Sequence, residues 1–201
     1  MVTPRRSDIN RAMNPPCKHL IQMSGAPGSG KSTLAKLLAQ SIDGVVINHD
    51  LIKAFFLQND IPFDQSAKLT YRLDWVLAED IIKQGRSVII DSTCNFDEVL
   101  ERGTALASQY GYDYKYVECR VDNIDLLDRR LRDRVPMRSQ RTAVDSPPPD
   151  SSAALSADEC RELFKNWIEN PRRPSGNIIV VDATNSPEES LDAILKEIVP
   201  R

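Results

Sequence analysis

Short apolar runs alternate with longer amphipathic segments along most of the chain. The runs at 19–23, 45–47, 87–90, 114–121 and 177–181 are typical of buried strands. Segments with helical periodicity separate them. Because strands that alternate with helices form parallel sheets, the pattern predicts an α/β fold with a five-stranded parallel sheet and helices on both faces.

Start and stop signals delimit the predicted helices. The first helix follows Lys31 and ends before Gly44, and a longer one runs from near Asp64 to Gly85. Their apolar stripes consist of Leu34, Leu37 and Leu38 in the first helix and Leu69, Leu73, Val76, Leu77 and Ile81 in the second. N-cap arrangements predict four further helix starts, at Asn95 with Glu98, at Asp122, at Ser156 with Glu159, and at Ser186 with Pro187 and Glu189.

Length and composition narrow the class of protein. A chain of 201 residues buries roughly 70% of its unfolded surface, so we expect residues 18–201 to form one domain and residues 1–17 to be a flexible tail. The formal net charge of -3 provides no overall field for nucleic acid or an anionic membrane. Four scattered cysteines without a CxxC pair favour a reducing, cytoplasmic compartment. No apolar run approaches the roughly 20 residues of a membrane span, and the first 17 residues lack a signal-peptide pattern.

The segment 146–152, which reads SPPPDSS, interrupts the alternation of strands and helices. Its three prolines remove backbone donors and fix φ, so it is predicted to be a loop. Such a loop is either a solvated surface connection or a mobile flap beside an active site.

A glycine-rich motif follows the first predicted strand directly and precedes the first predicted helix. The sequence GAPGSGKS fits GxxxxGK[ST], in which backbone N–H groups and the helix N-terminus surround phosphates. Lys31 would reach the β- and γ-phosphates of ATP, and the Ser32 hydroxyl would bind Mg²⁺. The predicted nucleotide-binding residues here are Gly25, Ala26, Pro27, Gly28, Ser29, Gly30, Lys31, Ser32 and Thr33. The alternative, a tight glycine turn that happens to carry a lysine, does not require the correct strand and helix on its two sides.

Two carboxylates follow apolar strands. Asp91 ends the third strand and would hold Mg²⁺ beside the glycine-rich motif if that strand neighbours the first; otherwise it caps the following turn. Asp50 follows the second strand, and all carboxyl ends of a parallel sheet meet at one edge. Asp50 would therefore be a general base for an attacking hydroxyl, or else the N-cap of the next helix. Neighbouring His49 has no histidine or cysteine partner at ligand spacing, so it does not indicate a metal site.

An arginine cluster ends the helix after the fourth strand. Arg130 and Arg134 are one helical turn apart and could close over the transferring phosphate as a lid. A solvated basic face and a contact to an RNA backbone are the alternatives. The absence of interleaved aromatic residues disfavours single-stranded nucleic acid.

The motifs GAPGSGKST, NHDLIK and VIIDSTCN together resemble P-loop kinases of the polynucleotide kinase, zeta-toxin and chloramphenicol-phosphotransferase-like group. The likeness covers most of residues 19–134 and, more loosely, 177–199. It implies a P-loop NTPase three-layer sandwich with strand order 2-3-1-4-5, which uses ATP and Mg²⁺. It also implies that Asp50 is the base and that Arg130 or Arg134 is a lid arginine. The acceptor side would include Thr93 and Asn95, and the adenine-side loop Asp182 to Asn185.

The chain departs from that pattern at two places. Where polynucleotide kinases have an arginine three residues after the base, this chain has Lys53, which cannot make a planar bidentate contact to an acceptor phosphate. Residues 136–157 have no counterpart in the family and form a Pro-rich insertion. The sequence therefore predicts a kinase for a hydroxyl of a small molecule or nucleoside-like compound. Its rivals are a 5′-hydroxyl polynucleotide kinase and a nucleotide-dependent switch module.

Overall fold

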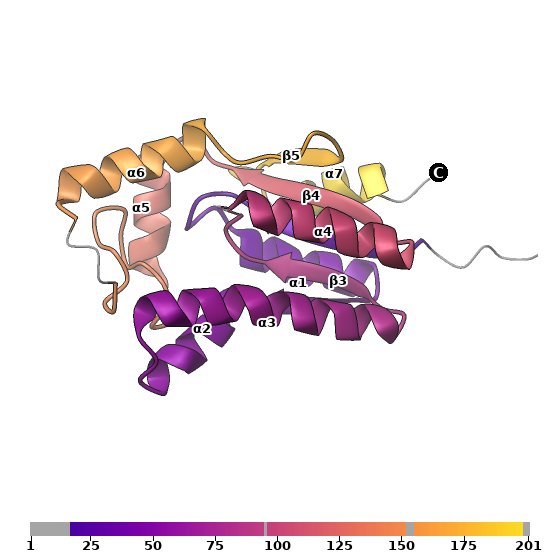
Figure 1. Cartoon of the computed structure of the whole chain (residues 1–201). Coiled ribbons are helices and arrows are strands. Elements are labelled where there is room, and N and C mark those ends of the chain that lie inside the picture. The colour runs from indigo at the N-terminus through magenta and orange to yellow at the C-terminus, as the bar shows by residue number, and fades with distance from the viewer. Residues whose placement is uncertain (1–16, 95, 152–154, 199–201) are drawn as a thin grey trace, which may run out of the picture.

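The structure of the protein, a computed structural model, describes residues 17–94, 96–151 and 155–198. Its sheet has five parallel strands in the order β2-β3-β1-β4-β5, so the predicted fold class and strand order are confirmed. The strands are β1 (His19–Ser24), β2 (Gly44–Asn48), β3 (Ser87–Asp91), β4 (Asp113–Arg120) and β5 (Ile178–Asp182). The helices are α1 (Lys31–Ser41), α2 (His49–Gln58), α3 (Phe63–Lys83), α4 (Asp97–Tyr110), α5 (Ile124–Asp133), α6 (Ala157–Glu169) and α7 (Pro187–Ile198) (Figure 1). Residues 1–16 of the predicted tail lie outside the described residues.

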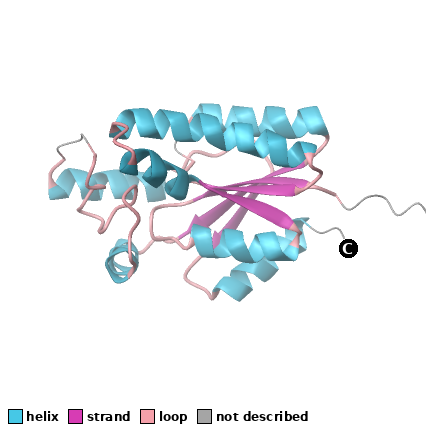
Figure 2. Ribbon diagram, turned by 90° about the horizontal axis from the view of Figure 1, so that it is seen from below, coloured by secondary structure: helices cyan, strands magenta, loops and turns pink. Residues whose placement is uncertain are grey.

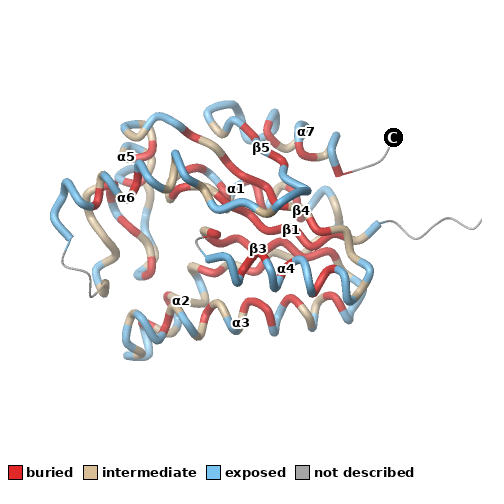
Figure 3. Tube along the Cα trace, turned by 45° about the horizontal axis from the view of Figure 1, so that its top comes forward, coloured by how far each residue is buried: buried red, intermediate tan, exposed pale blue. Residues whose placement is uncertain are grey.

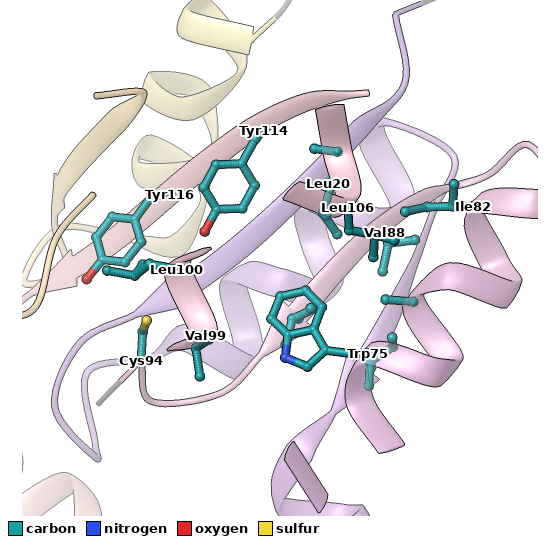
Figure 4. Close-up of a cluster of buried hydrophobic side chains, with 14 residues drawn as sticks. Leu20, Trp75, Ile82, Val88, Cys94, Val99, Leu100, Leu106, Tyr114 and Tyr116 are labelled. Atoms are coloured by element: carbon teal, nitrogen blue, oxygen red, sulfur yellow. The ribbon is translucent and has the colours of Figure 1, made fainter. Parts of the chain in front are cut away.

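Alternate residues of the central strand face two different helical layers. Leu20 belongs to a buried cluster with α3 and α4, in which Trp75 and Ile82 of α3 lie across from it (Figure 4). Ile21 and Met23 belong to the cluster with α1 and α7 on the other face. The helices accordingly cover the sheet from both sides (Figure 2), and the central strands β1 and β3 are buried along their whole length (Figure 3).

The last strand is buried on one face only. Ile179 and Val181 are buried, whereas Ile178 and Val180 are 36% and 47% exposed. The buried cluster on the side of α3 and α4 includes no β5 residue, because β5 is an edge strand beyond the reach of these helices. The prediction of a fully buried run at 177–181 is corrected in this respect.

Helix α3 turns a different face to the core from the predicted apolar stripe. Val76 and Leu77 are 59% and 36% exposed, so the stripe was wrong at these two positions. The buried positions are Ser66, Thr70, Asp74, Trp75, Ala78 and Ile82. Polar side chains tolerate burial here because they have partners within the protein, as Asp74 has with His49 at 2.6 Å.

The N-caps agree with the sequence at two of the four predicted helix starts. Ser156 and Glu159 form a capping box at α6, and Ser186 and Glu189 exchange the same pair of hydrogen bonds at α7. Asn95 lies outside the described residues.

Helix α5 begins one residue later than predicted. Asn123 caps it by accepting hydrogen bonds from the N–H groups of Asp125 and Leu126. The predicted cap, Asp122, instead forms an exposed ion pair with Arg120 at 2.8 Å. Asp and Asn cap helices equally well, so neighbouring Asp and Asn residues leave the first residue of the helix undecided in the sequence.

Helices α5 and α6 project beyond the carboxyl ends of the strands, and the insertion lies between them (Figure 1). Val144 of the insertion packs with Leu127 and Leu131 of α5 and Phe164 of α6 in a separate buried cluster. Arg141 lies over the Phe164 ring, 5.4 Å from its centroid. The insertion is therefore packed against these two helices. Among the described residues, no helix is long and apolar enough to cross a membrane.

An ion pair between a buried carboxylate and an exposed arginine ties the segment after α6 to the sheet. Arg173 donates two hydrogen bonds to the carboxylate of Glu118, at 2.7 and 2.8 Å, and Glu118 is 2% exposed. The adjacent Arg172 pairs with Asp97 at 2.6 Å, but both of these side chains are more than half exposed. The two arginines thus hold carboxylates in very different surroundings.

We predict that Arg173→Ala lowers the free energy of unfolding by about 2–3 kcal/mol, because it leaves the Glu118 carboxylate buried without its partner. The matched control Arg172→Ala should cost less than about 1 kcal/mol, since water replaces its partner. Urea unfolding of both variants measures the difference. Equal losses in the free energy of unfolding would show that the burial of Glu118 does not determine how much its ion pair with Arg173 stabilises the protein.

Candidate functional site

The turn between β1 and α1 forms a cradle of backbone N–H groups. Gly25, Gly28 and Gly30 have φ values of 128°, 88° and 91°, which favour glycine. A Cβ on Gly25 would lie 2.4 Å from the Cys119 carbonyl oxygen, so β4 closes one side of the turn. A Cβ on Gly30 would meet nothing within 4 Å, so the turn is open there. This geometry fits phosphate groups at the N-terminus of α1.

Lys31 folds back onto the turn. Its ammonium donates to the carbonyl oxygens of Gly25 and Ala26, at 2.8 and 3.0 Å. Burial lowers the pKa of Lys31, and the nearby Asp91 carboxylate opposes that shift. The buried hydroxyl of Ser29 has no hydrogen-bond partner among the described residues. A cation and an unpaired hydroxyl in one cradle fit an anionic ligand.

Ser32 and Asp91 form an oxygen-rich pair beside the cradle. Strand β3 neighbours β1, as the Asp91 prediction required. Asp91 is 6% exposed; burial raises its pKa, and a hydrogen bond with Ser32 opposes the rise. A hydroxyl and a carboxylate are ligands that Mg²⁺ prefers, so these two residues fit Mg²⁺ bound to a nucleotide.

Asp50 lies in the first turn of α2, at the same edge of the sheet. The N-cap of α2 is Asn48, which accepts from the N–H of Leu51 at 3.0 Å, so the interpretation of Asp50 as the N-cap is wrong. The Asp50 carboxylate instead accepts a hydrogen bond from the Gln140 amide at 2.7 Å. Its charge also raises the pKa of Lys31, Lys53 and Arg134, against the opposing effect of burial on each group. Asp50 therefore lies among the cationic groups of the site.

These groups line one cleft of about 720 Å³. Of the predicted site residues, it brings together Pro27, Gly28, Gly30, Lys31, Ser32, Thr33, Asp50, Lys53, Asp91, Thr93, Arg130 and Arg134. Asn95 lies outside the described residues. The cleft is also lined by residues of the insertion, including Pro147, Pro148 and Ser151, so the Pro-rich loop lies beside the site.

One wall of the cleft is aromatic. The ammonium of Lys53 lies 3.6 Å from the centroid of the Phe63 ring, and burial lowers the Lys53 pKa. The Tyr71 and Phe96 rings meet edge to face at 5.4 Å, and the Tyr71 hydroxyl donates to the Thr93 carbonyl oxygen at 3.2 Å. Phe96 is 50% exposed. A ligand on this side of the cleft would thus contact both a cation and apolar ring surface.

The two arginines predicted to form a lid have different partners. Arg130 donates to the carbonyl oxygen of Ala183 at 3.1 Å, and Arg134 to that of Arg141 at 2.8 Å. Arg134 has an extended backbone just after α5, so helical spacing does not set its direction as predicted. Its Nε is buried without a hydrogen-bond partner among the described residues, and burial lowers its pKa. Both guanidinium groups nevertheless line the cleft.

The loop after β5 lines a smaller adjoining cavity of about 290 Å³. Asn185 lies on this cavity together with Arg130 and Ser29. Asp182 does not line it, because its carboxylate accepts hydrogen bonds from the N–H and hydroxyl of Thr184. Of the predicted adenine-side loop, Ala183 and Asn185 therefore line the cavity beside the cradle.

Sequence reasoning missed several groups of the cleft. Gln140 and Ser139 both bond to Asp50, but their place in an insertion without a counterpart gave no signal. Tyr71 could have been predicted from the periodicity of α3. It shares one face of this helix with Ala67 and Asp74, away from the exposed Val76. The buried His49–Asp74 pair, at 2.6 Å, follows from the same face.

Comparisons with solved structures show the same fold. A putative kinase from Chloroflexus aurantiacus j-10-fl superposes with a TM-score of 0.68, at 20% identity over 92% of this chain and 97% of that one. A sugar kinase from Janibacter sp. HTCC2649 gives 0.60, at 18% identity over 92% and 97% of the two chains. The APS kinase of Mycobacterium tuberculosis in complex with AMPPNP and APS gives 0.57, at 19% identity over 90% and 98%.

Among curated proteins, the 2',3'-cyclic-nucleotide 3'-phosphodiesterase of Mus musculus is 35% identical over 104 residues, which are 51% of this chain. The match spans 24% of that protein's length. The sequence profile of the AAA domain family matches residues 20–147. Together with the cradle, the strand order and the kinase structures, this match confirms the resemblance to P-loop kinases, and the chain belongs to the AAA domain family.

Proposed function

We propose that the protein is an ATP- and Mg²⁺-dependent kinase that transfers the γ-phosphate to a hydroxyl of a small-molecule or nucleoside-like acceptor. The observation that carries the proposal is the position of Asp50. Its carboxylate shares one cleft with Lys31 and with the Ser32–Asp91 pair, and no cap role accounts for it. A nucleotide switch needs the cradle but has no use for a base on the acceptor side.

In this proposal different residues of the cleft have different roles in the transfer of the phosphoryl group. Bound ATP with Mg²⁺ supplies the phosphoryl group and neutralises part of its charge. Lys31 and Arg134 stabilise the charge that develops on the transferring group, and Ser32 with Asp91 holds the metal ion. Asp50 takes the proton of the acceptor hydroxyl while the oxygen of that hydroxyl attacks the γ-phosphorus. The bond between the γ-phosphorus and the oxygen that leaves with ADP breaks at the same time.

The insertion orients the proposed base. Gln140 accepts a hydrogen bond from the Met137 N–H at 3.1 Å and donates one to Asp50 at 2.7 Å. Ser139 donates to the backbone oxygen of Asp50 at 2.7 Å. The amide of Gln140 needs both its oxygen and its nitrogen for these contacts, so it holds one carboxylate oxygen and leaves the other for the acceptor. Closure of the insertion over the cleft also excludes water, which would compete as an acceptor.

The aromatic wall and Lys53 support an acceptor that combines a ring or apolar surface with polar groups. The relation to sugar kinase and APS kinase structures is one of fold and does not choose between acceptors. A screen of ADP release over nucleosides, sugars, aminoglycosides and 5′-hydroxyl oligonucleotides tests the proposal, with Lys31→Ala as the blank. Turnover that no acceptor stimulates would favour the switch, and strongly salt-dependent use of oligonucleotides would favour the polynucleotide kinase.

We predict that Asp91→Asn separates stability from ligand binding. Burial raises the Asp91 pKa, so its charge costs stability as the pH rises through and above the usual aspartate range. The variant should therefore unfold at the same or a higher temperature than the wild type at neutral pH, and at an unchanged temperature in acid. Its Mg²⁺-dependent ATP affinity should fall at least about 10-fold. Thermal unfolding across pH and calorimetric titration test both parts; retained affinity would remove Asp91 from the metal site.

For Asp50→Asn we expect kcat to fall on the order of 10² to 10⁴, the range for one acid–base group, with little change in the ATP dissociation constant. Asn keeps an oxygen that can accept from Gln140, so the melting temperature should stay close to that of the wild type. Asp122→Asn is the matched control, because Asp122 also follows a strand at this edge but is exposed outside the cleft. An undiminished kcat in Asp50→Asn would rule out the base.

Replacing Gln140 by Glu puts a second carboxylate against Asp50. We predict that the acid limb of the pH–rate profile moves to higher pH, because the added negative charge disfavours ionisation of the base. Ser139→Ala removes the neighbouring hydrogen bond without adding charge, and its acid limb should match the wild type. If Gln140→Glu keeps the wild-type limb, Asp50 is not the group that the profile reports.

A further inference from the structure

Three metal-ligating side chains converge at the end of the sheet opposite the cleft. His19 opens β1 and is the register partner of Asp113, the first residue of β4. Partners on adjacent parallel strands point to the same face, and Cys17, two residues before His19, does so if the chain stays extended. The thiol, imidazole and carboxylate ligand atoms all lie within 4.8 Å of one another.

His19 provides an independent sign that a ligand belongs there. It is 4% exposed, and its Nδ1 has no hydrogen-bond partner among the described residues. Asp113 Oδ2 lies 3.4 Å from this nitrogen, which is an ion-pair distance when the imidazole is protonated. A buried polar atom without a hydrogen-bond partner is unfavourable, so a positive ion between the two groups would remove this penalty.

We propose that Cys17, His19 and Asp113 bind a zinc-class divalent cation. Sulfur, nitrogen and oxygen ligands together suit Zn²⁺, whereas Mg²⁺ and Ca²⁺ prefer oxygen alone. A thiolate and a carboxylate balance the two charges of the ion. The distance of 3.4 Å between nitrogen and oxygen is close to the separation of two ligands in a tetrahedral zinc site with bonds of about 2.0–2.2 Å.

One group competes with the ion. The ammonium of Lys115 lies 3.3 Å from the same Asp113 oxygen. Binding therefore exchanges this ammonium for the metal at Asp113, and the remaining positive charge weakens the site. This competition predicts opposite effects of two substitutions on metal affinity. Removal of the Lys115 charge should strengthen metal binding, whereas removal of Cys17 should weaken it.

A metal ion at this site would change the stability of the folded protein rather than the proposed kinase reaction. Strand β1 separates it from the glycine-rich turn, by roughly 17 Å at about 3.3 Å per residue. In Figure 1 the chain enters β1 at the end of the sheet remote from α5 and α6. A metal ion there would clamp the start of β1 to β4, independently of the proposed kinase activity.

The test titrates the metal-free full chain with Co²⁺, a spectroscopic substitute for Zn²⁺, and then displaces it with Zn²⁺. We expect one equivalent of Co²⁺ to produce a thiolate-to-metal charge-transfer band that excess Mg²⁺ does not remove. Cys17→Ser should abolish the band and lower Zn²⁺ affinity at least about 100-fold, since even residues behind metal ligands contribute 10- to 100-fold. Zn²⁺ should raise the melting temperature of the wild type but not of this variant.

Two control variants sharpen the result. Lys115→Met should raise Zn²⁺ affinity, and Asp113→Asn should lower it, although both variants lose the same partly buried Lys115–Asp113 ion pair. The other cysteines, Cys94, Cys119 and Cys160, are buried, so a band that persists in Cys17→Ser reports a different site. That result, or the absence of any band in the wild type, overturns the proposal.

Discussion

The pairing of β1 with β3 is the contact on which the candidate site depends. It places the end of β3, and thus Asp91, beside the turn that follows β1. Asn48 of β2 is in register with Asp91, so Asp50 follows two residues later at the same edge. The side chain of Gln22 reinforces the arrangement by donating to the hydroxyl of Ser92 at 2.9 Å. Any shift in the order of the strands would separate the cradle, the metal ligands and the proposed base.

This dependence explains why so much of the cleft could be predicted from sequence. The glycine-rich motif defines its own geometry, and a parallel sheet brings the residues after its strands together whatever the details of packing. Asp91 and Asp50 follow strands of this sheet, and both line the cleft. Asn123 in place of Asp122, and the exposure of Val76 and Leu77, were not predictable. They depend on which of two similar residues the packing favours and on polar groups that find partners only in the folded chain.

The sequence predicted the Pro-rich part of the insertion to be a surface connection or a flap, but it gave no signal for the contacts of the insertion with Asp50. Its arginines have partners within the protein: Arg138 pairs with Asp150, and Arg141 lies buried against the rings of Phe164 and Trp167. Its contribution to the site comes from two uncharged side chains, Ser139 and Gln140, that reach Asp50 across about ninety residues of sequence. Such contacts follow from tertiary packing, and local sequence carries no trace of them.

The bonds of Lys31 to its own loop have a consequence for what the cradle accepts. Without nucleotide, the ammonium is already satisfied by two carbonyl oxygens of the turn. An incoming anion competes with these carbonyl oxygens for the ammonium, so its affinity depends on the difference between the two sets of hydrogen bonds. A lone phosphate offers little beyond what the loop offers itself, whereas a triphosphate also reaches the helix N-terminus and the metal ligands. The loop would thus favour a ligand that makes several contacts at once.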